Sequence, residues 1–239
     1  MKARTERGES SRQMILKRAL DVASCEGLEG LTIGRLAQEL DMSKSGLFAH
    51  FGSKEALQLA TVEAAARKFE QEVLGPVADT EPGLRRLVAG LDAWISHIEE
   101  SDYPGGCFFA AAAAEFDDRP GLVRDRIAKL SGTWLEWIEK EAHLSKRLGQ
   151  IKPDADTKQL VFELHAFVQE ANWTRQLLGK KEAFGRSRLA VRERLARSAT
   201  AEGSRIITAL KRRAAMKKHA RRSMNLIQRG SVERGGVRR

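Results

Sequence analysis

A short segment between Leu31 and Lys54 places small and polar side chains on one face of a predicted helix. The helix opens at Ser43, and Leu47 and Phe51 lie on its inner face, where they can pack. The side chains left on its outer face are those of Lys44, Ser45, Gly46, Ala49 and His50. Small and polar side chains of this kind can enter a groove without a clash. The chemistry indicated here is recognition of a nucleic acid.

Residues that could carry out catalysis or bind a metal form no known pattern. The sequence contains no Gly-x-Ser-x-Gly, no glycine-rich phosphate loop ending in Lys-Ser/Thr, and no His-Glu-x-x-His. The acidic pair Asp117-Asp118 precedes Arg119 and is typical of a charge cluster at a helix end. We therefore expect no enzyme activity, no metal and no other cofactor.

The two cysteines, Cys25 and Cys107, are far apart and form no Cys-x-x-Cys pair. This spacing argues against a disulfide framework and against a cysteine-rich metal site. Each cysteine lies in a helix that is predicted to pack, so we expect both thiols to be inert core residues. A redox role for Cys107 beside a pocket stays open as the alternative.

Four helices are predicted to position the recognition face. Their expected N-caps are Ser10 or Ser11, Thr32, Ser43 and Ser53, and their expected ends are Gly27, Asp41, His50 and Gly75-Pro76. The small Ala37 allows the second and third helices to cross closely. A short helix, a turn at Asp41-Met42-Ser43 and a second short helix have the spacing of a helix-turn-helix.

The rest of the chain, up to about residue 200, carries apolar side chains at helical spacing. A stripe from Leu84 to Ile98 is the clearest, and further helices are predicted near residues 107–116, 123–138, 160–178 and 184–199. The segment 107–116 is rich in alanine and nearly uncharged, so we expect it to be buried. There are only five prolines and no alternating strand pattern, which makes an all-α fold the prediction.

The positive charge of the chain lies in its tail. The 42 Lys and Arg exceed the 32 Asp and Glu by 10, but residues 203–239 alone carry twelve basic side chains and one acidic, a net +11. Residues 1–202 therefore sum to −1. Ile206, Ile207, Leu210 and Ala214 predict a short basic amphipathic helix, and the composition beyond Arg222 indicates disorder. The tail could be a solvated appendage, a non-specific arm for DNA, or a contact for an anionic surface.

No segment resembles a membrane span or a leader. The longest uncharged stretch, Tyr103–Ala114, has twelve residues, and a bilayer requires about 20. Residues Met1–Gln13 contain charges but no apolar core of a signal peptide. We expect a cytoplasmic protein with no membrane partner.

From about Ser11 to Thr61 the sequence resembles the DNA-binding domain of the tetracycline-repressor (TetR) family of transcriptional regulators. The matching residues are Leu31-Thr32, Leu36-Ala37, Ser43, Leu47-Phe48, Phe51 and Ser53-Lys54-Glu55-Ala56-Leu57. The segments 105–109 and 115–121 resemble one branch of the family's effector domains. The resemblance covers most of residues 11–200 and none of the tail.

The resemblance implies that the third helix lies in the major groove and that a dimer reads two half-sites. The implied DNA contacts are Lys44 and Ser45 at base edges, Gly46 on the same face, Thr32, Ser43, His50 and Lys54 at phosphates, and Arg35 as a further phosphate contact. Phe48 stands where the family usually has a tyrosine, so its contact becomes steric. Asp41 stands where a glycine usually adopts the left-handed turn.

For the second half, the resemblance implies an effector pocket and a dimer interface. The candidates for the pocket are Trp94, Phe108, Phe109, Trp134, His165 and Asn172, with Trp137 and His97 as further possibilities. Aromatic residues at this spacing are more often core than ligand-binding, and His97, beside Glu99-Glu100, is expected at the surface. The helices near 155–178 and 182–199, which carry Phe162, Phe167, Val168, Trp173 and Phe184, are expected to pair with a second copy.

The sequence therefore predicts a ligand-responsive transcriptional repressor that binds a palindromic operator on double-stranded DNA as a homodimer. Residues 1–61 would form the helix-turn-helix domain, with its motif at about 32–51. Residues 62–200 would form a helical domain for an unidentified small-molecule effector and for dimerisation, and residues 201–239 a basic, partly disordered tail. The alternative is a helical scaffold that binds RNA or an anionic membrane surface through the tail.

Overall fold

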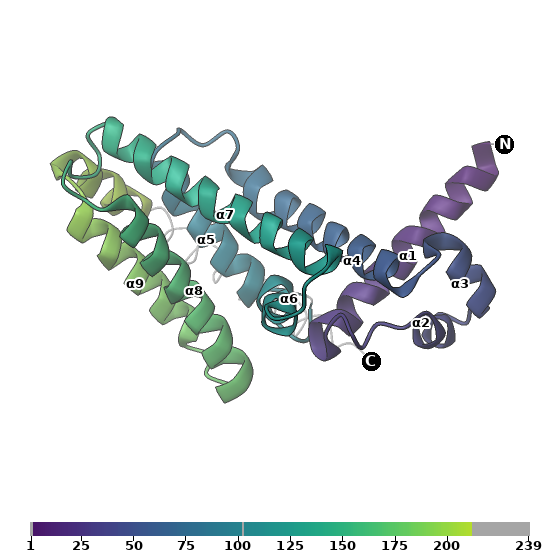
Figure 1. Ribbon diagram of the computed structural model, residues 1–239. Helices are drawn as coiled ribbons and strands as arrows, with labels where there is room; N and C mark the ends of the chain where they lie inside the picture. The colour runs from purple at the N-terminus through teal and green to yellow at the C-terminus, as the bar shows by residue number, and fades with distance from the viewer. Residues whose placement is uncertain (1, 102, 212–239) are drawn as a thin grey trace, which may run out of the picture.

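The computed structural model describes residues 2–101 and 103–211, and within them the chain is helical and has no β-strand (Figure 1). Its helices are α1 (Lys2–Glu26), α2 (Ile33–Glu39), α3 (Lys44–Phe51), α4 (Lys54–Phe69), α5 (Leu84–Glu99), α6 (Phe108–Phe116), α7 (Leu122–Arg147), α8 (Thr157–Leu178) and α9 (Ala183–Ser198). A π-helix, η1 (Glu70–Leu74), and a 3-10 helix, η2 (Gly75–Val77), follow α4. The predicted all-α fold is confirmed.

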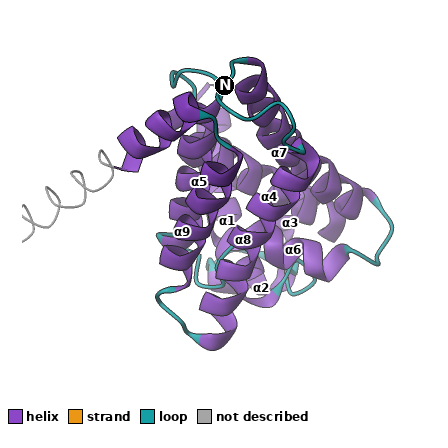
Figure 2. Cartoon of the chain, turned by 90° about the vertical axis from the view of Figure 1, so that its left-hand side faces the viewer, coloured by secondary structure: helices purple, strands orange, loops and turns teal. Residues whose placement is uncertain are grey.

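The molecule is elongated, and different sets of helices form its two ends (Figure 1). The first three helices, α1, α2 and α3, lie at one end, and α8 and α9 lie at the other (Figure 1). Between them α4 and α7 pack against each other along the length of the protein. Figure 2 shows the α8–α9 end facing the viewer, with the helices joined by loops.

The N-terminal helices follow the local chemistry of the sequence, except where α1 begins. Thr32, Ser43 and Ser53 are the N-caps of α2, α3 and α4, and each side chain accepts a backbone N–H three residues on. The expected cap at Ser10 or Ser11 is wrong, because α1 begins at Lys2 and both serines lie inside it. Residues 2–9 contain no proline, so nothing in them stops the helix.

Two hydrophobic cores share α6 as a boundary. One core is formed by α1, α2, α3 and α4 together with buried side chains of α6 and the start of α7, among them Phe108, Phe116 and Ile127. The other joins α5, α7, α8 and α9. Phe109 packs against both cores. A shift of α6 would therefore disturb the packing of both ends of the molecule.

Three expectations about helix faces and ends are wrong. Cys25 is exposed rather than packed, because it lies on the outer side of the last turn of α1. Ala113 and Ala114 on α6 are exposed, so only one face of that helix is buried. The fourth helix does not continue as one α-helix to Leu74, because it changes to a π-helix at Glu70.

The start of the basic tail belongs to the second core. Residues 201–211 are helical, Thr200 Oγ1 accepts the N–H of Gly203 at 3.2 Å, and Ile206 and Ile207 are buried. Leu210 packs against the same core. The predicted amphipathic helix is confirmed as far as residue 211. Ala214 and the segment beyond Arg222, for which disorder is expected, lie outside the described residues.

Candidate nucleic-acid interface and ligand cavity

The turn between α2 and α3 orients the candidate recognition helix. Leu36 and Leu47 are fully buried between the two helices and α1. Asp41 has a φ of 51°, which is the left-handed conformation expected at this position. The backbone N–H of Met42 then donates to Ala37 O at 2.8 Å and closes the turn. These contacts fix the packing of α2 against α3 and leave Lys44 and Ser45 on α3 exposed.

Two of the candidate phosphate contacts, Thr32 and Ser43, also cap helices. Thr32 Oγ1 accepts the N–H of Arg35 at 3.2 Å, and Ser43 Oγ accepts the N–H of Gly46 at 3.0 Å. A hydroxyl that accepts from the helix backbone keeps its own proton, which it can donate to a phosphate oxygen. Helix N-termini also favour anions through their unpaired N–H groups. These two positions can therefore bind DNA while they cap.

The outer face of α3 is open to a partner. Lys44 and Ser45 are exposed, and the Phe48 side chain is 52% exposed. His50 is half-buried, and its ring lies 6.2 Å from that of Phe51. The packing of the helix N-terminus also favours a glycine at position 46, because a Cβ there would lie 2.9 Å from the capping Ser43 Oγ. The predicted base-edge and phosphate contacts on α3 are thus gathered on one accessible surface.

Arg35 and Lys54, the other two candidate phosphate contacts, have carboxylate partners in the same domain. Lys54 Nζ lies 2.8 Å from Glu29 Oε2. Arg35 pairs with Glu26 and with Glu39, and these hydrogen bonds raise its pKa further above an already high value. Sequence reasoning did not anticipate these pairs, because Glu26 and Glu29 are far from their partners along the chain.

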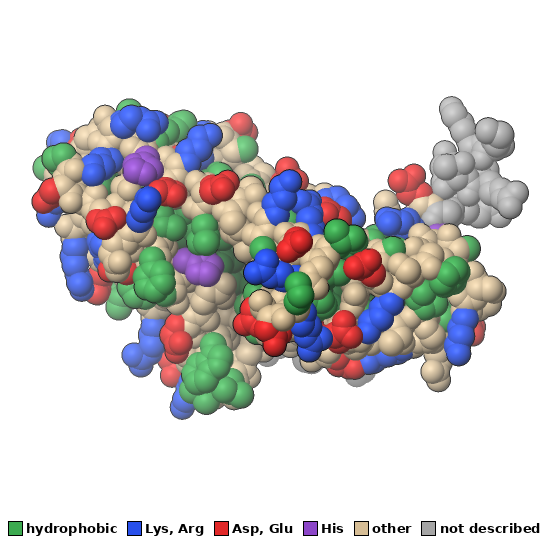
Figure 3. All heavy atoms as spheres, viewed as in Figure 1, with side chains coloured by type: hydrophobic (Ala, Val, Ile, Leu, Met, Phe, Trp, Pro, Cys, Tyr) green, Lys and Arg blue, Asp and Glu red, His purple; other side chains and the backbone are tan. Residues whose placement is uncertain are grey.

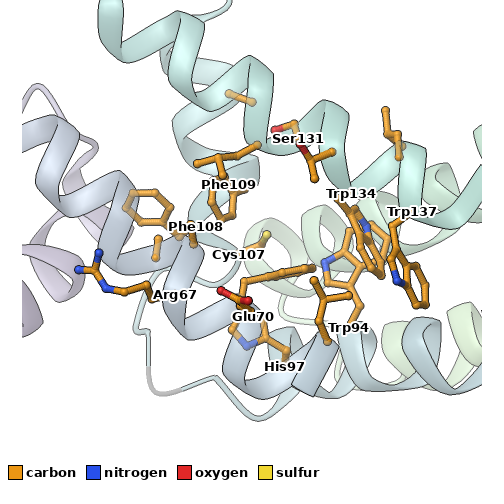
Figure 4. Close-up of a pocket in the computed structure, with 18 of the residues that line it drawn as sticks. Arg67, Glu70, Trp94, His97, Cys107, Phe108, Phe109, Ser131, Trp134 and Trp137 are labelled. Atoms are coloured by element: carbon orange, nitrogen blue, oxygen red, sulfur yellow. The ribbon is translucent and has the colours of Figure 1, made fainter. Parts of the chain in front are cut away.

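A cavity of about 500 Å³ lies between α4, α5, α6, α7 and α8 (Figure 4), within the size range of small-molecule sites. Its aromatic lining consists of Phe69, Trp94, Tyr103, Phe108, Phe109, Trp134 and Trp137, with His97 and His165. Figure 4 shows the three tryptophans at one side, Phe108 and Phe109 at the other, and Cys107 between them. Five of the six candidate pocket residues therefore surround one cavity.

The sixth candidate, Asn172, is not among the residues that line the cavity. Its Oδ1 accepts the backbone N–H of Cys107 at 3.1 Å, at the start of α6. The amide therefore fixes α6 to α8 instead of facing a ligand. Sequence reasoning also missed Phe69, because its position at the junction of α4 and η1 carries no signal of its own.

Four charged side chains line the cavity, those of Glu63, Arg67, Glu70 and Arg126, and burial lowers the pKa of both of its histidines. Burial lowers the pKa of His97, although its hydrogen bond to Glu72 acts in the opposite direction. Burial also lowers the pKa of His165, which stacks on Trp94 with ring centroids 5.4 Å apart. The expectation that His97 lies at the surface is wrong, because packing against Phe69 leaves its side chain 9% exposed. Apart from the charged side chains, most of the lining is aromatic or apolar.

Cys107 lies in the wall of the cavity, and burial raises the pKa of its thiol. A raised pKa favours the protonated thiol over the reactive thiolate.

The described residues hold no group of three or more His, Cys, Asp or Glu side chains placed to bind a metal ion. In the same part of the chain, no helix combines the length and apolar character that a bilayer crossing requires.

The far end of the molecule exposes large apolar side chains on α8 and α9. Phe162 is 70% and Trp173 52% exposed, and Leu177, Leu178 and Leu189 are exposed as well. Figure 3 shows hydrophobic side chains gathered at the tip where α8 ends. Val168 and Phe184, which the sequence placed among the residues of this surface, belong to the core.

Comparison with known proteins identifies the domains on this scaffold. Residues 15–61 match the family described as bacterial regulatory proteins, tetR family, and residues 83–191 match the tetracyclin repressor-like C-terminal domain. The chain is 35% identical over 103 residues to the HTH-type transcriptional repressor NicS of Pseudomonas putida, which is 40% of this chain and 47% of that one. The matched region thus spans about half the length of this curated relative.

Solved structures share the fold. A TetR transcriptional regulator from Chloroflexus aurantiacus superposes with a TM-score of 0.71 at 24% identity, over 78% of this chain and 94% of that one. The structure of AibR in complex with isovaleryl coenzyme A and operator DNA has a TM-score of 0.57 at 23% identity, over 68% and 84% of the two chains. At these identities the likeness is one of fold.

Proposed function

Because the chain belongs to the TetR family of bacterial transcriptional regulators, we propose that it represses transcription by binding a palindromic operator as a homodimer, and that a small molecule in the cavity releases it. The family is one of DNA-binding regulators, and its curated relatives include named repressors. The homodimer, the operator and the effector are parts of the proposal.

The observation that carries the DNA-binding role is the exposed outer face of α3, a helix whose N-terminus is capped by Ser43. In this proposal Lys44 and Ser45 contact base edges, and Gly46 lets the helix backbone come close to the groove. Thr32, Ser43, His50, Lys54 and Arg35 hold phosphates and so fix the register of the protein on the duplex. Phe48 supports this interface by an apolar contact.

The cavity supports regulation because α6 contributes to both the cavity and the DNA-binding end. Phe108 and Phe109 line the cavity, while Phe116 and Glu115, on the same helix, contact the first core and the turn after α1. An aromatic effector that displaces α6 would favour a dimer whose recognition helices no longer match the half-site spacing. The AibR complex supports the idea that this fold accommodates a small molecule and DNA.

Lys44→Ala is the direct test of the recognition helix. The operator is first isolated by selection from random duplexes, and binding is then measured by fluorescence anisotropy. We expect the variant to lose about 1–3 kcal/mol of binding free energy and to relax discrimination at one base position. Lys129→Ala, which removes an exposed lysine of α7, serves as control. If Lys44→Ala binds all sequences as the parent does, Lys44 does not read a base.

Truncation of the tail separates this function from the scaffold alternative. The chain is cut after Lys211, because this keeps the buried Ile206 and Ile207 and also Leu210, which packs against the same core. We expect the truncated protein to keep its preference for the palindrome and to show a weaker dependence of affinity on salt. A scaffold that binds RNA or anionic vesicles through the tail would lose all nucleic-acid and vesicle binding in the same assays.

A further inference from the structure

The cations beside the recognition helix are already paired with anions. Lys54 Nζ lies 2.8 Å from Glu29 Oε2. Arg35 Nε donates to Glu39 Oε1 at 3.0 Å, and its terminal nitrogens donate to Glu26. Arg18 Nε donates to Glu39 as well, at 2.7 Å. A DNA phosphate that binds Lys54 or Arg35 must therefore compete with a carboxylate for the cation or share the cation with it.

Glu29 is held beside Lys54 by bonds in which Lys54 takes no part. Its backbone N–H donates to Glu115 Oε1 at 2.9 Å. Gln58, whose side chain is 4% exposed, donates to Glu29 Oε1 at 3.2 Å and to Leu28 O at 2.9 Å. An exposed ion pair usually contributes little, because two mobile side chains must be ordered to form it. Here the anion is ordered in advance, so it competes persistently for the lysine.

Glu115 is the residue that positions this anion. Its second oxygen, Oε2, accepts the N–H of Leu28 at 2.6 Å. Gly27, the residue before, has a φ of 77°, and a Cβ there would lie 2.5 Å from Glu115 Oε2. The carboxylate therefore occupies the space that the missing side chain leaves, and it fixes the turn 27–29 against α6.

The carboxylates are ionised wherever the protein is folded near neutral pH. Hydrogen bonds lower the pKa of Glu29 through Lys54 and Gln58, that of Glu26 through Arg35, and that of Glu39 through Arg18 and Arg35. Each cation is thus matched by a full negative charge. This local balance agrees with the net charge of only +1 over residues 1–60.

We propose that Glu29, together with Glu26 and Glu39, substitutes for DNA phosphate inside the free protein and so limits its affinity for the phosphate backbone of any sequence. The inference rests on the DNA-binding function proposed above. On binding, Lys54 exchanges one anion for another, so the pair releases fewer counterions than a lysine without a partner. The base contacts of α3 then supply a larger share of the binding free energy.

The test compares Glu29→Gln with the parent as full chains on mixed-sequence duplexes, across about 50–200 mM salt. We expect the variant to bind roughly two- to five-fold more tightly per recognition domain at low salt. The slope of log K against log salt should steepen by about 0.9 for each lysine released from its pair. The double variant Glu26→Gln/Glu39→Gln should shift both quantities in the same direction.

Glu55→Gln is the matched control, because it removes the same charge one residue from Lys54. Glu55 is exposed in the first turn of α4, and none of the ion pairs found among the described residues involves it. Equal effects of Glu55→Gln and Glu29→Gln would mean that net charge alone is responsible, and would overturn the inference. So would an unchanged slope in Glu29→Gln.

Two further readouts keep the result decisive. Thermal unfolding shows whether Glu29→Gln is folded, and if it is not, Glu26→Gln/Glu39→Gln carries the test. Failure of the parent protein to prefer a selected palindrome would overturn the proposed function itself. A parent that binds its palindrome, with variants of unchanged salt dependence, would overturn only the role of the carboxylates.

Discussion

Phe162→Glu and Trp173→Glu are each expected to turn the protein into a monomer and to weaken operator binding by roughly 10²- to 10⁴-fold. The two residues are eleven positions apart on α8, which places them on the same side of the helix. They are 70% and 52% exposed, and burial of each such side chain in a dimer contributes about 1.5–3 kcal/mol. A glutamate there would place an unpaired charge in the interface.

The loss of affinity has a separate physical cause from the loss of the dimer. A dimer that binds one half-site holds its second recognition helix at high effective concentration over the other, and a monomer does not. Sedimentation measures the oligomeric state, and anisotropy measures binding to the palindrome. Leu122→Glu, at an equally exposed leucine at the start of α7, should leave both unchanged.

The two assays can contradict the proposal in different ways. If Phe162→Glu and Trp173→Glu remain dimers, the interface lies elsewhere on the molecule. If they become monomers but keep the affinity of the parent, recognition does not depend on two half-sites. In either case thermal unfolding must first show that the variants are folded, which we expect because both side chains are exposed in the single chain.

The parts of the fold that sequence reasoning predicts are those that local chemistry determines. Thr32, Ser43 and Ser53 cap helices because a side-chain oxygen and a backbone N–H three residues on are sufficient for the motif. Asp41 adopts the left-handed turn because a short polar side chain tolerates it better than a bulky one. The apolar stripe of α5 predicts its buried face in the same way.

The parts that escape prediction depend on contacts between distant elements. His97 stands beside two glutamates in sequence, but its surroundings are Phe69 and Glu72, about one helix earlier in the chain. The role of Asn172 could not be predicted for the same reason, since its hydrogen-bond partner is the backbone N–H of Cys107, which is distant in the sequence. Lys54 can be recognised in the sequence as a cation, but its pairing with Glu29 cannot be predicted, because the pair forms only when the turn 27–29 is in place.

Ser131→Trp is expected to imitate a bound effector without any knowledge of the effector's identity. Ser131 lines the cavity from α7, opposite His97 and Glu70 in the view of Figure 4. An indole at this position would occupy space that a ligand would otherwise fill. We expect the variant to bind the selected operator about 5- to 150-fold more weakly than the parent, the range typical of allosteric coupling.

The physical reason for this expectation is the place of α6. An indole that fills the cavity presses on Phe108 and Phe109, and packed cores respond to added volume by shifting whole elements. The same helix holds the turn after α1 through Glu115, so a shift of α6 changes the position of the DNA-binding end. The response requires no contact between the new side chain and DNA.

Gly132→Trp provides the matched control, because it adds the same side chain one residue further along α7, where a Cβ has no neighbouring atom within 4 Å. Gly132 does not line the cavity, so this variant should bind the operator as the parent does. Both variants should remain dimeric by sedimentation, since α8 and α9 are unchanged. If Ser131→Trp is folded and dimeric and keeps full operator affinity, occupation of the cavity does not control DNA binding, and the effector must act at another site.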